Sequence, residues 1–394
     1  MKKFVLAIMA LVMAAAVAQP AAARSFKALH EFSGLDDGRN PKGKLLRDAA
    51  GNLYGTTFSD GAGTEGTVFK IDSTGREKVL FQFHNSDGAI PDSALIQDQA
   101  GNLYGTAQEG PGGAGIVYKL SPQGKQTILF AFQGCLFCHR PRVPSGALFM
   151  DQLGNLYGTT VFGGKGKCQS GCGIIYRLDP AGKLHVLYEF SGGADGRVPI
   201  GPLLPDANGN LYGVAQAGGD LACSELRRGC GTVFRLARNG KLTVLHTFHG
   251  VADGATPQPD LLLDTTSGSL YGAASQGGIS ENGVLFKLSS NGKYTILHRF
   301  TGADDGSSPN GGLVLDEAGN LFGTAQTGGR GTDGTAFVIN PAGHLKLLHT
   351  FNAGFDGDFP QGGLIRDQAG HLYGVAVSNG LIGQQGGNVF EITP

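Results

Sequence analysis

Short apolar runs separated by turn residues recur along the chain from about residue 25 onward. In one stretch they predict β-strands at residues 312–316, 320–325, 335–339 and 344–351. Asn340-Pro341-Ala342-Gly343 and similar segments lie between the runs, and Pro and Gly favour the backbone angles of tight turns. Apolar residues do not recur with a period of 3.6, which excludes a helical repeat.

These four runs belong to a unit that occurs seven times. Its marker is Gly-x-Leu-Tyr/Phe-Gly, which starts at Gly51, Gly101, Gly154, Gly209, Gly268, Gly319 and Gly370. Four short strands in a repeat of about 40–50 residues are typical of a β-propeller blade. The sequence therefore predicts an all-β protein, a single seven-bladed propeller over residues 24–394 with four antiparallel strands per blade.

The ends of the repeat array are offset by one strand. Residues 26–32 match the fourth strand of a unit, such as residues 242–248, whereas residues 388–392 match a third strand. We predict that the N-terminal strand joins the last blade and closes the ring, which would leave no unpaired sheet edge there.

Residues 1–23 have the pattern of a secretory signal peptide. Lys2 and Lys3 precede an apolar run over residues 4–18, and small residues up to Ala23 offer a cleavage point. The run is short for a membrane span, although an uncleaved anchor is the alternative. The pattern predicts a periplasmic or secreted protein with no membrane span in the mature chain.

Composition narrows the class further. The chain has 67 glycines among 394 residues, and its 31 Lys and Arg nearly balance its 32 Asp and Glu. The glycine content suits many tight turns, and an apolar fraction of 41% excludes a disordered chain. The near-neutral net charge does not indicate a protein that binds nucleic acid. We expect a monomer.

The repeat also resembles a known family. GNLYGT-type segments, followed by GTVFKL-type and TVLHxF-type segments, are similar to those of the GloVer (Gloeo/Verruco) tandem-repeat proteins of bacteria, across the whole chain after the signal. The resemblance implies an exported protein and no settled activity.

Several residue types recur once per repeat. Aromatic residues occupy three strand positions, and we predict that they pack between blades, a stacking platform for sugars being the alternative. Four histidines share a fourth-strand position, and we expect them at the rim of the fold: His30, His246, His298 and His349.

An Asp-Gly pair precedes most blades. It predicts a turn in which the Asp side chain accepts a hydrogen bond from the backbone two residues further on. The alternative is a ring of carboxylates near the channel mouth that holds calcium or a polyol.

The six cysteines lie in loops expected on one face of the ring, which we call the long-loop face. This face carries the connections from second to third strands and from each fourth strand to the next blade. An even number of cysteines in an exported protein predicts disulfides. Local spacing favours the pairs Cys135–Cys138, Cys168–Cys172 and Cys223–Cys230. Cys135, Cys138 and His139 also spell C-x-x-C-H, a c-type haem attachment pattern, which is the alternative there.

The same loops concentrate positive charge, whereas the other long-face loops are mostly acidic. The candidate ligand-binding residues are Arg140, Arg142, Lys165, Lys167, Arg227 and Arg228. We predict a binding module that holds an anionic glycan or a protein partner through this face. A lyase or hydrolase at the channel mouth and a haem redox protein are the alternatives. No G-x-S-x-G, H-E-x-x-H or P-loop motif is present, so no catalytic residue or metal site is predicted and a non-enzyme is favoured.

Overall fold

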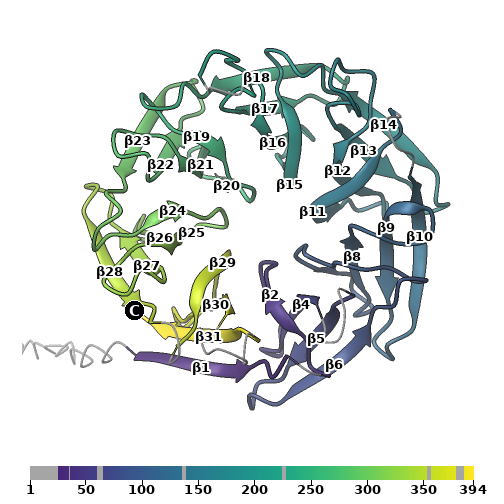
Figure 1. Cartoon of the computed structure of the whole chain (residues 1–394), viewed down its shortest axis with the longest axis horizontal. Helices are drawn as coiled ribbons and strands as arrows, with labels where there is room; N and C mark the ends of the chain where they lie inside the picture. The colour runs from purple at the N-terminus through teal and green to yellow at the C-terminus, as the bar shows by residue number, and fades with distance from the viewer. Residues whose placement is uncertain are drawn as a thin grey trace, which may run out of the picture.

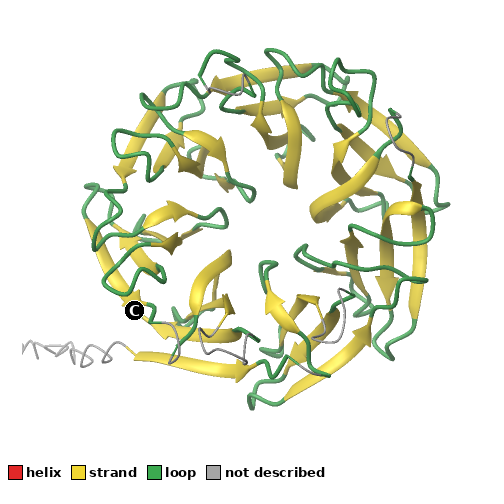
Figure 2. Ribbon diagram, in the orientation of Figure 1, coloured by secondary structure: helices red, strands yellow, loops and turns green. Residues whose placement is uncertain are grey.

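Seven antiparallel β-sheets stand around a common axis, like the blades of a propeller (Figure 1). The computed structural model describes residues 25–34, 36–59, 65–134, 139–223, 228–352, 356–378 and 386–394. Within these ranges the secondary structure consists of strands and loops only (Figure 2). The prediction of an all-β, seven-bladed propeller is confirmed.

Each blade starts at the axis with an innermost strand, which is short or split in two in four blades and continuous in the other three. The innermost strands are β2 (Arg39–Pro41) with β3 (Leu46–Arg47), β7 (Ile96–Gln97), β11 (Arg142–Met150), β15 (Arg197–Pro205), β19 (Ala255–Pro257) with β20 (Leu262–Asp264), β24 (Ser307–Pro309) with β25 (Val314–Leu315), and β29 (Asp358–Arg366). The second strands are β4 (Leu53–Ser59), β8 (Leu103–Ala107), β12 (Leu156–Phe162), β16 (Leu211–Ala217), β21 (Ser269–Gln276), β26 (Leu321–Thr327) and β30 (Leu372–Ser378).

The two outer strands of each blade follow in the same order. The third strands are β5 (Thr67–Ile71), β9 (Gly113–Leu120), β13 (Ile174–Leu178), β17 (Thr232–Leu236), β22 (Val284–Leu288), β27 (Thr335–Ile339) and β31 (Asn388–Thr393). The fourth strands, on the outside of the ring, are β6 (Glu77–Gln82), β10 (Gln126–Gln133), β14 (Leu184–Glu189), β18 (Leu242–Thr247), β23 (Tyr294–Arg299), β28 (Leu345–Thr350) and β1 (Ser25–Glu31).

The seventh sheet is built from both ends of the chain. Strand β1 pairs antiparallel with β31, from Ser25 opposite Thr393 to Glu31 opposite Asn388. The order of this sheet is β1-β31-β30-β29, so the N-terminal strand takes the outer position that β28 takes in the preceding blade (Figure 1).

The core lies between neighbouring blades. Phe83, at the end of one blade, contacts Tyr118 of the next with ring centroids 5.1 Å apart, and both are fully buried. Phe32 and Phe69 make the same edge-to-face contact at 5.0 Å. Edge-to-face pairs stabilise aromatic packing beyond the area that they bury. The repeated aromatics therefore serve as the packing between blades, as predicted.

The rim histidines and the Asp-Gly pairs, predicted as two separate features, form one motif. His298 Nε2 lies 3.0 Å from Asp305 Oδ2, and the same pairing joins His246 to Asp253 at 2.9 Å. Asp305 also accepts a hydrogen bond from the Thr301 amide, four residues earlier. The predicted bond to the residue two positions on is therefore wrong. The alternative of a carboxylate ring at the channel mouth is wrong too, because these carboxylates lie beside the outer strands.

Among the described residues, no helix is long and apolar enough to cross a membrane. The predicted signal peptide, residues 1–23, lies outside the described ranges and stays a prediction.

Candidate functional site

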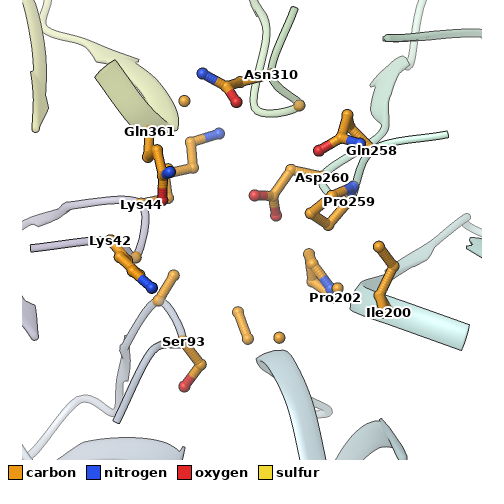
Figure 3. Close-up of a pocket in the computed structure, with 18 of the residues that line it drawn as sticks. Lys42, Lys44, Ser93, Ile200, Pro202, Gln258, Pro259, Asp260, Asn310 and Gln361 are labelled. Carbon is orange, nitrogen blue, oxygen red and sulfur yellow. The ribbon is translucent and has the colours of Figure 1, made fainter. Parts of the chain in front are cut away.

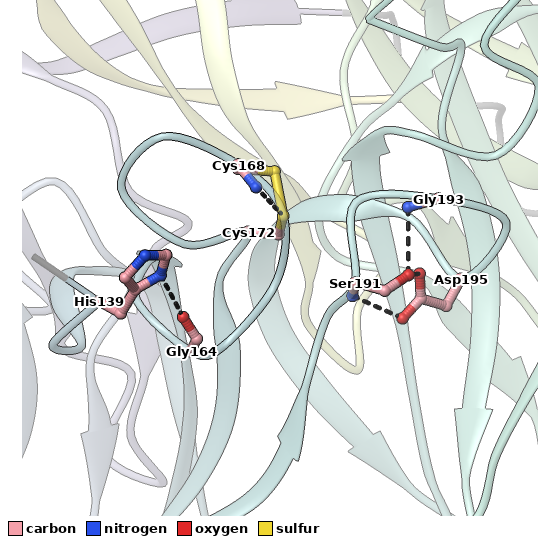
Figure 4. Close-up of a disulfide and its surroundings, with 7 residues drawn as sticks. All are labelled: His139, Gly164, Cys168, Cys172, Ser191, Gly193 and Asp195. Carbon is pink, nitrogen blue, oxygen red and sulfur yellow. Dashed lines mark hydrogen bonds between the residues drawn. A yellow bond between two sulfur atoms is a disulfide. The ribbon is translucent and has the colours of Figure 1, made fainter. Parts of the chain in front are cut away.

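Two disulfides close loops on the long-loop face. Cys168 and Cys172 join in the loop between β12 and β13, where the Cys168 amide also donates to Cys172 Sγ (Figure 4). Cys223 and Cys230 join in the equivalent loop of the next blade, between β16 and β17. Both predicted pairings are confirmed. Cys135 and Cys138 lie outside the described residues, so the third disulfide and the haem alternative stay predictions.

Hydrogen bonds connect these loops to their neighbours. His139 Nδ1–H donates to the Gly164 carbonyl at 2.9 Å, and the Gly164 amide donates back to the His139 carbonyl (Figure 4). The Lys167 amide donates to the Ser191 carbonyl at 3.2 Å. The loops around residues 139–141, 163–173 and 191–196 thus form one continuous surface.

A further bond extends this surface into the fourth blade. The Gly219 amide donates to the Gly193 carbonyl at 2.9 Å. Because disulfides and backbone hydrogen bonds hold the loops, their side chains are presented on a rigid base. Rigid loops lose little conformational entropy when a ligand binds.

The structure brings most of the predicted basic residues onto this surface. Arg140, Lys165, Lys167 and Arg228 are exposed. Arg142 is half-buried at the start of β11, and its guanidinium lies 4.6 Å from the ring centre of Phe162, a cation–π distance. Arg227 lies outside the described residues.

Arg197 adds a basic group that is not among the predicted ligand-binding residues. It starts β15, and burial followed by the charge of Arg228 lowers the pKa of its guanidinium. The effect of the Arg228 charge on this pKa means that the two guanidinium groups repel each other. Arg197 therefore places a further cationic side chain where the loops meet the innermost strand β15.

The acidic side chains in this region accept hydrogen bonds from other groups of the protein. Glu189 accepts a hydrogen bond from the Lys165 amide at 3.1 Å. Asp195 accepts from the Ser191 amide at 2.8 Å and from the Tyr188 hydroxyl at 3.0 Å. Burial and the charge of Asp195 raise the pKa of Tyr188 to about 12, so its proton stays in this bond.

Asp220 is engaged in the same way. It accepts hydrogen bonds from the Ala222 amide and from His249 Nδ1–H, both at 2.9 Å. By contrast, Arg140, Lys165 and Lys167 form no ion pair within the part of the chain that the structure describes. The arrangement can therefore offer a ligand three cationic side chains that no ion pair engages among the described residues.

Sequence reasoning missed a second set of residues, at the axis of the ring. A cavity of about 320 Å³ is lined by residues 42–44, 92–94, 145–147, 200–202, 258–260, 310–311 and 361–363, with Gln216 and Gln326 (Figure 3). Apart from Gln216 and Gln326, these residues lie in every blade between a proline and a leucine that recur, such as Pro41 and Leu45. The signal was available: the three residues between them differ from blade to blade while their flanks repeat.

A sequence model of the Gloeobacter/Verrucomicrobia repeat matches residues 16–141, 138–314 and 221–394. No curated protein is similar in sequence to this chain. Among the described residues, no group of three or more His, Cys, Asp or Glu side chains is placed to hold a metal ion.

Solved structures share the fold at low sequence identity. The extracellular domain of a one-component system from B. thetaiotaomicron matches 93% of this chain with a TM-score of 0.59 and 12% identity, and this chain spans 39% of that structure. A protein from Bacteroides uniformis described as a 6-phosphogluconolactonase matches 78% of this chain and 83% of its own length, with a TM-score of 0.50 and 15% identity. Similarity at this level shows a shared fold alone.

Proposed function

This chain belongs to the Gloeobacter/Verrucomicrobia repeat family, and from that premise we propose that it is a binding protein for acidic glycans. The binding surface is the basic part of the long-loop face, on the third and fourth blades. The repeat itself accounts for the hairpins and the packing between blades. We therefore expect the loops that differ from the repeat to carry the function.

One observation carries the proposal. The acidic side chains Glu189, Asp195 and Asp220 are held in hydrogen bonds within the protein, while Lys165 and Lys167 are exposed beside them. A purely structural protein does not require exposed lysines without ion-pair partners. A polymer that carries carboxylate or sulfate groups would neutralise their positive charge. An acidic protein partner is the alternative occupant.

We also propose that the protein works outside the cytoplasm. Disulfides such as Cys168–Cys172 form and persist mainly in oxidising compartments, and the N-terminal segment has the pattern of a secretory signal.

The test compares two variants that each lack six positive charges. The first replaces Arg140, Arg142, Lys165, Lys167, Arg227 and Arg228 with Ser. The matched control replaces six exposed residues in the short turns between third and fourth strands, on the opposite face: Arg76, Lys125, Lys183, Arg238, Lys241 and Lys293.

Binding to polygalacturonate and alginate, with dextran as a neutral polymer, is measured by biolayer interferometry. We expect the wild type and the control variant to bind the acidic polymers, and the first variant to lose at least ten-fold in affinity. Binding should also weaken between 50 and 300 mM NaCl, because salt screens exposed charges. Equal loss in both variants would indicate unspecific charge attraction and contradict the proposal.

A further inference from the structure

The cavity at the axis is built separately from the basic surface. All seven blades contribute to it, through the residues between their recurring prolines and leucines (Figure 3). In three blades these residues belong to the innermost strand, and in the other four they lie in an interruption of that strand or just before it. A volume of about 320 Å³ falls at the lower end of the range of small-molecule sites, about 300–1,000 Å³. It therefore suits one or two sugar rings and not a polymer chain.

The wall of the cavity is preformed by direct contact between neighbouring blades. A side chain on Gly146 would overlap the backbone of Gly201, and one on Gly201 would overlap Pro259. The Gly312 amide donates to the Asp260 carbonyl at 3.1 Å, and the Leu364 amide donates to the Gly312 carbonyl at 3.0 Å. Because backbones meet edge to edge here, the lining residues are held in place without a ligand.

Hydrogen-bond acceptors gather on the wall formed by the fifth and sixth blades. Gln258 Nε2–H donates to the Thr256 carbonyl at 3.0 Å and to Ser275 Oγ at 2.9 Å, which leaves its carbonyl oxygen without a partner among the described residues. Asn310 Nδ2–H likewise donates to the Pro360 carbonyl and to Thr324 Oγ1, so Asn310 Oδ1 has no partner in the part of the chain that the structure describes.

Asp260 adds a carboxylate to the same wall, directed toward the cavity (Figure 3). Within the described ranges no hydrogen bond or ion pair holds it. Burial raises its pKa, and the charge of Lys44 opposes that effect. The carboxylate is thus costly to keep charged without a partner, and a ligand hydroxyl would reduce that cost.

Cations lie on the facing wall, contributed by the first blade. Lys42 and Lys44 are two positions apart in the strand direction, and both line the cavity (Figure 3). Lys42 is already engaged: its ammonium lies 3.9 Å from the ring centre of Phe58, and Asp92 acts on it electrostatically. Lys44 has no hydrogen-bond partner among the described residues and is the donor open to a ligand.

We infer that this cavity binds a neutral polyhydroxylated molecule of one or two sugar rings. Hydroxyls on one side of the ligand donate to Asp260, Gln258 and Asn310, and an oxygen on the other side accepts from Lys44. The two lysines and two aspartates of the lining balance in formal charge, which favours a neutral ligand with hydroxyls over one with a net ionic charge. The site is independent of the glycan surface proposed above.

The test measures binding of glucose, galactose, mannose, maltose, cellobiose and myo-inositol by isothermal titration calorimetry. We expect at least one to bind the wild type, and Asp260→Asn and Lys44→Met each to weaken it by about ten- to a hundred-fold, since each removes a charged hydrogen-bond partner. Asp304→Asn, on the exposed surface, is the matched control and should bind like the wild type.

Other outcomes separate this inference from its competitors. Calcium chloride and galacturonate are titrated alone. Binding of calcium that depends on Asp260, or of galacturonate with no neutral sugar bound, would overturn the inference in favour of a cation or an anion site. Absence of binding by the whole neutral panel would also overturn it. Asn310→Leu gives a second variant if Asp260→Asn fails to fold. The variant that lacks the six basic loop residues should keep the binding of neutral sugars, so failure of one site is distinguishable from failure of the other.

Discussion

At the scale of single residues, one aspartate in most blades organises the turn between the first and second strands. Asp98 accepts hydrogen bonds from the Ala100 and Asn102 amides, from the Asn102 side chain and from the Tyr104 hydroxyl, all within 3.0 Å. Asp48, Asp151 and Asp206 accept the equivalent sets. The recurring tyrosine thus has two roles, because its ring packs and its hydroxyl holds the turn.

These bonds make stability depend on pH. Partial burial works against the charged form of Asp98, but the hydrogen bonds outweigh it and hold its pKa below the usual value of 3.8. The folded state therefore gains stability from the carboxylate above about pH 4, and this contribution is lost as pH falls through the lowered pKa. The pKa of Asp48, Asp151, Asp206 and Asp367 is lowered in the same way.

We predict that Asp98→Asn lowers the free energy of unfolding by about 1–2 kcal/mol at pH 7, because the amide is a weaker acceptor than the carboxylate. Urea denaturation at pH 7, 5 and 3 measures the difference from the wild type, which should shrink at pH 3. Asp304→Asn, whose side chain is 73% exposed, is the control and should change little. A difference that persists unchanged at pH 3 would contradict the role of the charged form.

At the scale of elements, β1 supplies the outer strand of a sheet whose other strands end the chain. Six residues of β1 pair with residues of β31, and the strand is followed by Phe32, whose side chain is 1% exposed. The Phe32 amide donates to the Gly387 carbonyl at 2.9 Å. Without this segment, the edge of β31 and the ring of Phe69 would face water.

We predict that deleting residues 24–33, in addition to residues 1–23, strongly destabilises the protein. The chain that starts at residue 24 is the control. Phe32→Ala keeps the strand and should itself cost about 3–5 kcal/mol, because it leaves a cavity in the core. Thermal melting followed by circular dichroism compares the three. Equal melting of the deletion and the control would show that the last blade does not need β1.

At the scale of the whole molecule, the ring requires glycine where inner strands meet. Gly201 has a positive φ of 78°, and a side chain there would run into Pro259 of the next blade. Gly292 has a similar φ of 86°, but a side chain there would meet nothing within 4 Å. Both positions therefore require a positive φ, but only Gly201 lies in contact with a neighbouring blade.

We predict that Gly292→Ala costs about 1 kcal/mol, the strain of a side chain at positive φ. Gly201→Ala should cost at least about 2 kcal/mol, because overpacking between blades adds to that strain. Chemical denaturation of both variants gives the difference. If the two substitutions cost the same, the inner strands are not in the tight contact that the structure shows.

The sequence was sufficient for the strands, the turns and their sevenfold order. The sevenfold order follows from the recurrence of the Gly-x-Leu-Tyr/Phe-Gly segment, which is visible in the sequence itself. The alternation of apolar residues and the Asn-Pro-Ala-Gly type of turn are local, because each lies within a few residues of the chain. The pairings Cys168–Cys172 and Cys223–Cys230 were predictable for the same reason, since each closes a short loop.

Only the tertiary structure decided which of these residues meet. His298 and Asp305 are seven positions apart with a turn between them, so no strand or helix period relates their side chains. The charge of Lys44 acts on Asp260 across the axis although 215 residues separate them, because closing seven blades into a ring puts one segment of every blade around one cavity. The repeat sequence determined the blade, and the ring determined the chemistry at its centre, since side chains that share no local pattern become neighbours only when the circle is complete.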